Sequence, residues 1–291
     1  RTHIKSLMSL AAAGAVPSAL FAKGSEADAL DSMGVAEGRA FGYKRSVSHW
    51  TVESLEWDDL CSWLTEQGIE GVDLVGPENW HYLKKHGLDC SMCNGAELNL
   101  VDGFIHEEFE GVLQQRYREM IPRVAKAGYR NLICFSGNRR GLSEQAGLTQ
   151  AAKALRPMVE LAEEHGVVLQ MELFNSTVDH PDYMADSSQW GIALAKELAS
   201  DSFKLLYDIY HMQIMEGNLI ANIEANHKFY GHYHVAGVPG RHEPWEDQEI
   251  NYPAVMSAID RVGFEGYVAL EYVFSRPVKQ SMGRSYNEFV K

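Results

Sequence analysis

Four polar side chains stand directly after short apolar stretches, and their chemistry can be combined. Glu172 ends the run VVLQME, Asp208 ends LLYD, His234 ends YGHYH and Glu271 ends YVALE. A carboxylate that is desolvated alone is costly, and three carboxylates in one place repel one another, whereas a divalent cation resolves both problems. Three carboxylates and one imidazole therefore predict a site for one divalent ion: Mn²⁺, Mg²⁺, Co²⁺ or Zn²⁺. For any one of these residues alone, a salt bridge to a neighbouring loop is the simpler interpretation; the four together favour the metal.

The elements that must position these residues alternate along the chain. Short apolar runs predict strands over Gly42–Val47, Gly71–Val75, Asp89–Cys93, Asn131–Phe135, Val167–Leu173, Lys204–Ile209, Gly231–Val235 and Gly266–Tyr272. Amphipathic periodicity predicts helices over Leu55–Glu66, Glu110–Ala127, Leu148–His165, Ser188–Leu198, Asn218–Asn226 and Tyr252–Val262. Gly68, Gly128, Gly166 and Gly263 follow helical runs, where a left-handed C-cap is wanted.

Eight strands that alternate with helices indicate a parallel sheet, either open and doubly wound or closed into a barrel. No G-x-G-x-x-G motif follows the first strand, so the dinucleotide-binding open sheet has no support. We therefore predict an α/β fold with a single (β/α)₈ barrel domain over residues 41–291. In such a barrel the carboxyl ends of the strands converge on one mouth, which brings the four polar residues together.

Composition and net charge limit the kinds of partner that the protein can bind. The chain of 291 residues carries a formal net charge of −14 and no cluster of Lys or Arg. Such an acidic surface repels phosphate backbones, so nucleic acid is not an expected partner and metal-dependent DNA cleavage is disfavoured. We expect a small-molecule substrate and no membrane span. A homodimer stays open, because nothing in the sequence decides the oligomeric state.

The first residues resemble a targeting segment. Arg1, His3 and Lys5 form a basic start, and Leu7 to Phe21 is an apolar, alanine-rich run. This pattern is typical of a secretory signal peptide and is too short for a membrane span. It predicts a signal-like segment over residues 1–30 and an exported or periplasmic protein; the alternatives are an amphipathic surface helix and a cytoplasmic location.

The four cysteines do not predict a metal site. Cys90 and Cys93 form one C-x-x-C pair, but a structural zinc site usually needs two such pairs. We expect Cys61, Cys90, Cys93 and Cys134 to be buried thiols.

Three longer motifs surround the strand ends. They read MELFN from Met171, DIYHMQIMEG from Asp208, and VAGVPGRHEP from Val235, and the last is followed by Ile-Asn-Tyr at Ile250. From about Phe41 to Glu271 the chain resembles the hydroxypyruvate isomerases of the xylose-isomerase-like sugar isomerase and epimerase superfamily. The PGRHEP run is the most discriminating part, because the sugar 3-epimerases of that superfamily generally lack it.

The resemblance implies a metal-dependent isomerase. It implies that Glu172, Asp208, His234 and Glu271 bind the metal and that Glu172 and Glu271 exchange the substrate proton. Isomerising an α-hydroxy carbonyl moves a proton between neighbouring carbons through an enediolate, for which a metal can act as Lewis acid and a glutamate as base. The expected reaction interconverts hydroxypyruvate and tartronate semialdehyde.

The resemblance also implies that His211 and Arg241 hold substrate oxygens. A guanidinium pairs well with a carboxylate, although Arg241 could instead bridge Glu243 or Glu246. His211, on the loop after Asp208, could instead orient a metal ligand.

Further side chains are candidates for the pocket wall. We expect His49 and Trp80 to contact substrate, and Trp50, Phe174 and Trp245 could also line the pocket, although aromatic residues near barrel mouths often only pack. His232 lies two residues before His234 and therefore points to the same side of its strand, one layer deeper.

Two other functions stay open. A ketose 3-epimerase would use the same glutamate pair across one carbon, and His234 favours it, because many hydroxypyruvate isomerases carry Gln there whereas 3-epimerases carry His. The second is an exported barrel that binds sugars or sugar acids without turnover.

Overall fold

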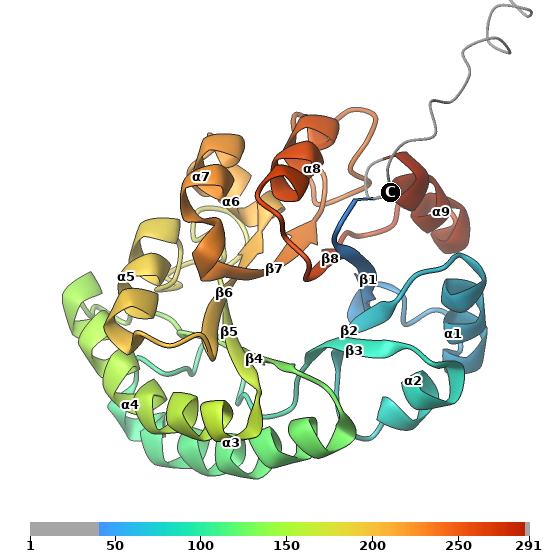
Figure 1. The fold of residues 1–291 in the computed structure, drawn as a ribbon. Helices are drawn as coiled ribbons and strands as arrows, with labels where there is room; N and C mark the ends of the chain where they lie inside the picture. The colour runs from blue at the N-terminus through green and yellow to red at the C-terminus, as the bar shows by residue number, and fades with distance from the viewer. Residues whose placement is uncertain (1–40, 289–291) are drawn as a thin grey trace, which may run out of the picture. The chain divides into compact units, whose positions relative to one another are not determined.

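The structure, a computed structural model, describes residues 41–288, which form a closed eight-stranded parallel barrel surrounded by helices (Figure 1). The strands are β1 Lys44–Ser48, β2 Gly71–Val75, β3 Asp89–Cys93, β4 Asn131–Cys134, β5 Val168–Glu172, β6 Phe203–Asp208, β7 Tyr230–Val235 and β8 Tyr267–Leu270. They pair in sequence order, and β8 closes the barrel on β1. The predicted (β/α)₈ barrel is thus confirmed.

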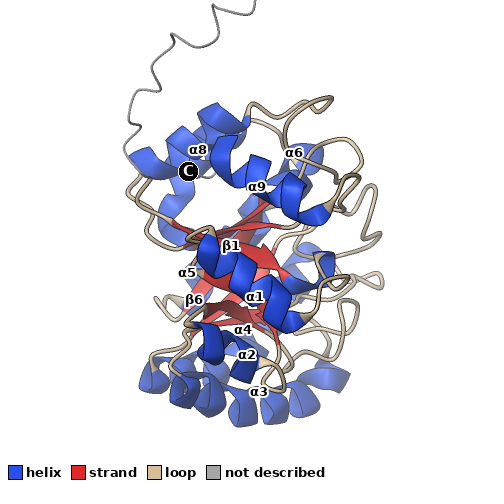
Figure 2. Cartoon of the chain, turned by 90° about the vertical axis from the view of Figure 1, so that its right-hand side faces the viewer, coloured by secondary structure: helices blue, strands red, loops and turns tan. Residues whose placement is uncertain are grey.

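The helices pack around the outside of the strands (Figures 1 and 2). They are α1 Trp57–Glu66, α2 Trp80–His86, α3 Glu107–Ala127, α4 Glu144–His165, α5 Ser188–Leu198, α6 Ile209–Met215, α7 Leu219–Asn226, α8 Tyr252–Arg261 and α9 Val278–Glu288, with short 3₁₀ turns at His49–Thr51 and His227–Phe229. No helix of the described residues is long and apolar enough to cross a membrane.

The predicted elements agree with the structure to within a few residues at their ends. The four glycines expected to end helices all have a positive φ, between 65° at Gly68 and 82° at Gly128. The predictions missed α2, α6 and α9. The strand predicted over Lys204–Ile209 ends at Asp208, because the Asp208 side chain caps a helix that starts at Ile209.

All four cysteines are buried free thiols, as expected. The signal-like segment over residues 1–30 lies outside the described residues, so export stays a prediction.

Candidate active site

The four strand-end residues converge at one end of the barrel. Glu172 ends β5, Asp208 ends β6, His234 lies near the end of β7 and Glu271 directly follows β8. One ligand atom from each can be chosen so that all lie within 4.8 Å of one another, and all four side chains are buried. The barrel therefore brings together the four residues whose types predicted a metal site.

His234 lies at the centre of this cluster. Its Nδ1 is 3.0 Å from Glu172 Oε1 and 2.8 Å from Glu271 Oε2, and 3.9 Å from Asp208 Oδ2. Because one nitrogen faces three carboxylates, this ring edge is where a cation or a proton would be shared.

Asp208 presents one oxygen to the cluster and uses the other locally. Its Oδ1 accepts hydrogen bonds from the backbone N–H groups of Tyr210 (2.8 Å) and His211 (3.2 Å) at the start of α6. Its Oδ2 is buried and has no hydrogen-bond partner among the described residues. A buried carboxylate oxygen that lacks a hydrogen bond and lies beside two other carboxylates fits a cation ligand.

Burial and neighbouring charges give the three carboxyl groups of the cluster different pKa values. Burial, aided by the charge of Glu271, raises the pKa of Glu172 to about 7, and burial raises the pKa of Asp208 to about 6. Burial also acts to raise the pKa of Glu271, but His234 and Arg241 outweigh it and hold that pKa well below its ordinary value. The two glutamates therefore differ in proton affinity, as an acid and base pair requires.

Arg241 is the cationic partner of this cluster. One Nη lies 2.6 Å from Glu271 Oε2 and 3.5 Å from Asp208 Oδ2. The backbone of Arg241 has a φ of 56°, and Val273 N–H donates to its carbonyl at 2.7 Å, so the PGRHEP loop is folded onto the end of β8. The alternative bridge to Glu243 is not formed.

The partners of Glu243 lie elsewhere. It accepts hydrogen bonds from Ser275 N–H (3.0 Å), Ser275 Oγ (2.6 Å) and Ser281 Oγ (3.1 Å). Glu246, the other alternative partner of Arg241, pairs with Arg276 and Arg284. These contacts tie the loop to α9 and leave Arg241 to the cluster.

His211 lies in α6 and not on a loop, which corrects the sequence interpretation. It is fully buried, with Nε2 3.5 Å from Asp208 Oδ2 and Nδ1 2.7 Å from Asn175 Nδ2. Burial lowers its pKa well below the ordinary value, so the ring is neutral. It can orient Asp208 or meet a substrate oxygen.

A cavity of about 260 Å³ opens above the cluster. Its lining comprises Trp50, Leu74, Leu100, Phe135, Glu172, Phe174, His180, Arg241 and Glu271. The indole of Trp50 donates to Glu271 Oε1 at 2.8 Å. The cavity is therefore lined by the charged side chains of Glu172, Arg241 and Glu271 and otherwise mainly by apolar side chains. Trp50 and Phe174 are among the lining residues, as the sequence suggested.

Three aromatic candidates lie elsewhere. The His49 ring stacks on Trp57 with ring centres 4.0 Å apart, outside the cavity lining. Trp80 begins α2, is buried, and donates its indole N–H to the Val75 carbonyl at 2.8 Å. Trp245 donates to Ser285 Oγ at 2.9 Å. Packing satisfies these groups, so the structure does not place His49 or Trp80 for substrate contact.

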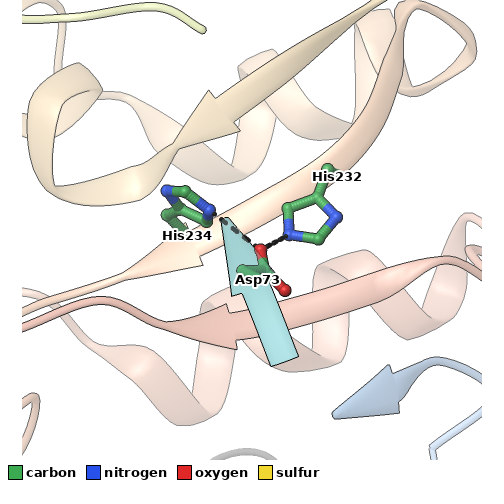
Figure 3. A group of neighbouring side chains, drawn as sticks. All are labelled: Asp73, His232 and His234. Atoms are coloured by element: carbon green, nitrogen blue, oxygen red, sulfur yellow. Dashed lines mark hydrogen bonds and ion pairs between the residues drawn. The ribbon is translucent and has the colours of Figure 1, made fainter. Parts of the chain in front are cut away.

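Asp73 was not among the residues predicted for the site. This fully buried residue of β2 contacts His232 and lies 3.2 Å from His234 Nε2 (Figure 3). The prediction that His232 occupies a deeper layer of the same strand face is confirmed, since it is fully buried beneath the cluster. The charged residue inside the strand G-V-D-L-V was the available signal.

Comparison with known proteins agrees with this architecture. A human protein described as a candidate hydroxypyruvate isomerase is 38% identical over 112 residues, which cover 38% of this chain and 40% of the human protein. The 2-oxo-tetronate isomerase of Cupriavidus necator is 36% identical over 111 residues, covering 38% of this chain and 42% of the relative. The matched segments thus span about two-fifths of these relatives.

The fold has close structural counterparts. A crystal structure titled AP endonuclease, family 2, from Brucella melitensis superposes with a TM-score of 0.75 and 23% identity, covering 85% of this chain and 98% of the other. That likeness concerns the fold alone.

The family model described as xylose isomerase-like TIM barrel matches residues 77–287. The match takes in the six strands β3 to β8 and therefore all four clustered residues. Because it covers most of the chain, the protein belongs to the xylose isomerase-like TIM barrel family.

Proposed function

We propose that this protein is a metal-dependent isomerase that interconverts a small hydroxy-carbonyl acid, of the hydroxypyruvate and tartronate semialdehyde type. The observation that carries the proposal is the convergence of Glu172 and Glu271 with Asp208 and His234 at the barrel mouth. The relatives named as isomerases of small oxo acids support the substrate class.

The cluster can hold one divalent ion. Glu172, Asp208, His234 and Glu271 would supply three carboxylate oxygens and one imidazole nitrogen, a donor set that suits Mn²⁺, Mg²⁺, Co²⁺ or Zn²⁺. Asp208 Oδ2, which has no hydrogen-bond partner among the described residues, supports this assignment. When bound, such an ion supplies Lewis-acid stabilisation of negative charge that develops on the substrate oxygens.

The two glutamates are the proposed proton-transfer groups. One glutamate, as a carboxylate, removes the proton from the carbon that bears the hydroxyl group, and the other, in its carboxylic acid form, protonates the neighbouring carbon of the enediolate. The proton of the original hydroxyl group passes to the oxygen of the former carbonyl, and proton exchange with solvent after product release restores both glutamates. Both side chains line the cavity and are buried, so each can transfer a proton directly to or from a bound substrate and can exchange protons with solvent between turnovers.

Arg241 is the proposed anchor for the substrate carboxylate. Its guanidinium lines the cavity beside Glu271 and lies over the faces of Trp50 and Tyr210, each with the ring centre 5.3 Å away. Stacked in this way, the guanidinium can present its N–H groups to a planar carboxylate. His211 is the proposed donor to a further substrate oxygen.

A ketose 3-epimerase is the second candidate. His234 favours it, since it provides an imidazole where the resembling isomerases often carry glutamine. Binding without turnover is the remaining alternative, and the proposed exported location goes with it or with either enzyme.

Solvent-deuterium exchange followed by NMR tests these proposals. Hydroxypyruvate and then a panel of free ketoses are incubated in D₂O with Mn²⁺ or Mg²⁺, and then with a chelator. We expect metal-dependent deuterium incorporation into hydroxypyruvate with formation of tartronate semialdehyde. Exchange only at C3 of a ketose would assign the epimerase activity instead.

Two variants sharpen this experiment. Glu271→Gln should abolish exchange, whereas Glu160→Gln, an exposed residue of α4, should leave it unchanged. No exchange by the wild-type protein with any substrate, despite bound metal, would refute the catalytic roles of Glu172 and Glu271.

A further inference from the structure

We propose that Asp73 is a positioning residue that fixes the ring of His234, so that Nδ1 is presented to the metal site and Nε2 carries the proton. The inference rests on the proposed metal site. Asp73 reaches His234 from β2, across the barrel interior, and Figure 3 shows its carboxylate between the rings of His232 and His234.

The two nitrogens of His234 face opposite partners. Nδ1 faces Glu172 and Glu271, while Nε2 lies 3.2 Å from Asp73 Oδ2. A neutral imidazole carries a proton on only one nitrogen, and an ionised carboxylate only accepts hydrogen bonds. Asp73 therefore selects the form with the proton on Nε2, which leaves the Nδ1 lone pair for a cation. Histidine ligands of metals commonly donate their second N–H to a carboxylate in this way.

Asp73 is itself held in place. Ser91 donates its hydroxyl to Asp73 Oδ1, and His232 contacts Asp73 Oδ2 through Nε2. All four side chains of this chain of contacts, His234 included, are fully buried. With both carboxylate oxygens engaged, Asp73 cannot rotate away from His234 without losing these contacts.

The backbone of β2 is deformed where Asp73 stands. Its pairing with β3 shifts register on both sides of Asp73, and Leu74 has a φ of 58°. Adjacent residues of a regular strand face opposite sides, but here Asp73 faces the barrel interior while Leu74 lines the cavity. A left-handed leucine is strained, and such strain concentrates at functional sites. The bulge re-aims two consecutive side chains toward the same site.

A purely structural role would not require a charge here. A carboxylate buried in a barrel interior costs more than an apolar residue of similar size, even when it is paired. The cost is accounted for if Asp73 sets the orientation of a metal ligand.

Metal affinity tests the inference. Mn²⁺ binding is measured by calorimetry for the wild-type protein, Asp73→Ala, Asp73→Asn and the control Gln170→Met. Gln170 is a buried polar residue of β5 whose amide donates to the Gly231 carbonyl. We expect affinity to fall about 10–100-fold in Asp73→Ala. Gln170→Met should bind as the wild type does.

Asp73→Asn keeps the shape of the side chain and guards against loss of folding. Its amide oxygen can still accept hydrogen bonds from the facing imidazoles but carries no negative charge, so we expect an intermediate affinity. A folded Asp73→Asn and a folded Asp73→Ala that both bind Mn²⁺ within about threefold of the wild type would overturn the positioning role, since loss of such an outer partner typically costs more.

A second readout follows the proton on Nε2. In the Co²⁺-loaded wild-type protein, we expect a paramagnetically shifted, slowly exchanging N–H resonance from His234, and we expect Asp73→Ala to lose it. Retention of that resonance in Asp73→Ala would contradict the inference. A wild-type protein that binds two ions per chain and an Asp73→Ala variant that binds one would also contradict it, because Asp73 would then be a metal ligand itself.

The outcomes separate this inference from the proposed function. If the wild-type protein binds metal without turning over any substrate, the isomerase proposal fails while the comparison of Asp73 variants still decides the positioning role. If the wild-type protein binds no divalent ion at all, both fail.

Discussion

Binding of the proposed ion should release protons, and the site indicates how many. Without a bound cation, the pKa of Glu172 is raised to about 7 and that of Asp208 to about 6, mainly by burial. Burial lowers the pKa of His234, but the adjacent Glu271 and Glu172 outweigh it and raise that pKa well above its ordinary value. At pH 7, Glu172 then carries about half a proton, Asp208 about a tenth and His234 about one.

Metal ligands must be deprotonated, so binding near pH 7 should release roughly one and a half protons. Because protons compete with the cation for these groups more strongly as the pH falls, the affinity for the cation should weaken by about 30-fold for each pH unit below 7. Calorimetry of Mn²⁺ binding in buffers of different ionisation enthalpy measures the released protons directly.

Glu172→Gln is the matched variant, because it removes one titrating ligand and keeps its size. It should release about half a proton less at pH 7 and bind more weakly. Binding heats that do not depend on the buffer, together with an affinity that is flat across neutral pH, would refute the ligand set or the pKa shifts assigned to it.

Three further predictions concern the loops around the site. Arg241→Lys should raise KM for an α-hydroxy-carbonyl acid by about 10–100-fold, because Lys lacks the planar fork that pairs with a carboxylate; steady-state kinetics would show this, and an unchanged KM would argue against the anchor role. Glu243→Gln should destabilise the fold by about 1–3 kcal/mol at pH 7 in urea unfolding. Burial acts to raise the pKa of Glu243, but the hydrogen bonds from Ser275 outweigh it, so that this pKa is lowered. The stabilisation by the Glu243 carboxylate is therefore present above the ordinary pKa of 4.5 and is lost as the pH falls through the lower value of the folded protein. A stability difference between Glu243→Gln and the wild type that grows on acidification would contradict this prediction. Gly103→Ala should destabilise by about 1–3 kcal/mol, because a Cβ there would lie 2.4 Å from the backbone of the loop after β4, whereas Gly111→Ala, with nothing within 4 Å, should be neutral or stabilising by up to about 1 kcal/mol in the same assay.

The sequence alone predicted the elements that carry strong local signals. The bounds expected for the strands Gly71–Val75 and Asp89–Cys93 and for the helix Ser188–Leu198 agree with the structure. The helices α2 and α6 escaped prediction because each has only seven residues, too few for a clear 3.6-residue period. For α6, the decisive feature is the side chain of Asp208, which caps the helix with one oxygen.

The order of strands and the position of polar residues at their carboxyl ends determined that Glu172, Asp208, His234 and Glu271 would meet, because closure of an eight-stranded barrel leaves those ends one common mouth. Only the tertiary structure decided the neighbours of that cluster. The contact between Asp73 and His234 joins β2 to β7 across the barrel and requires a bulge, and the pairing of Arg241 with Glu271 requires a left-handed residue in a loop. Such contacts depend on how distant segments pack, and no local spacing along the chain specifies them.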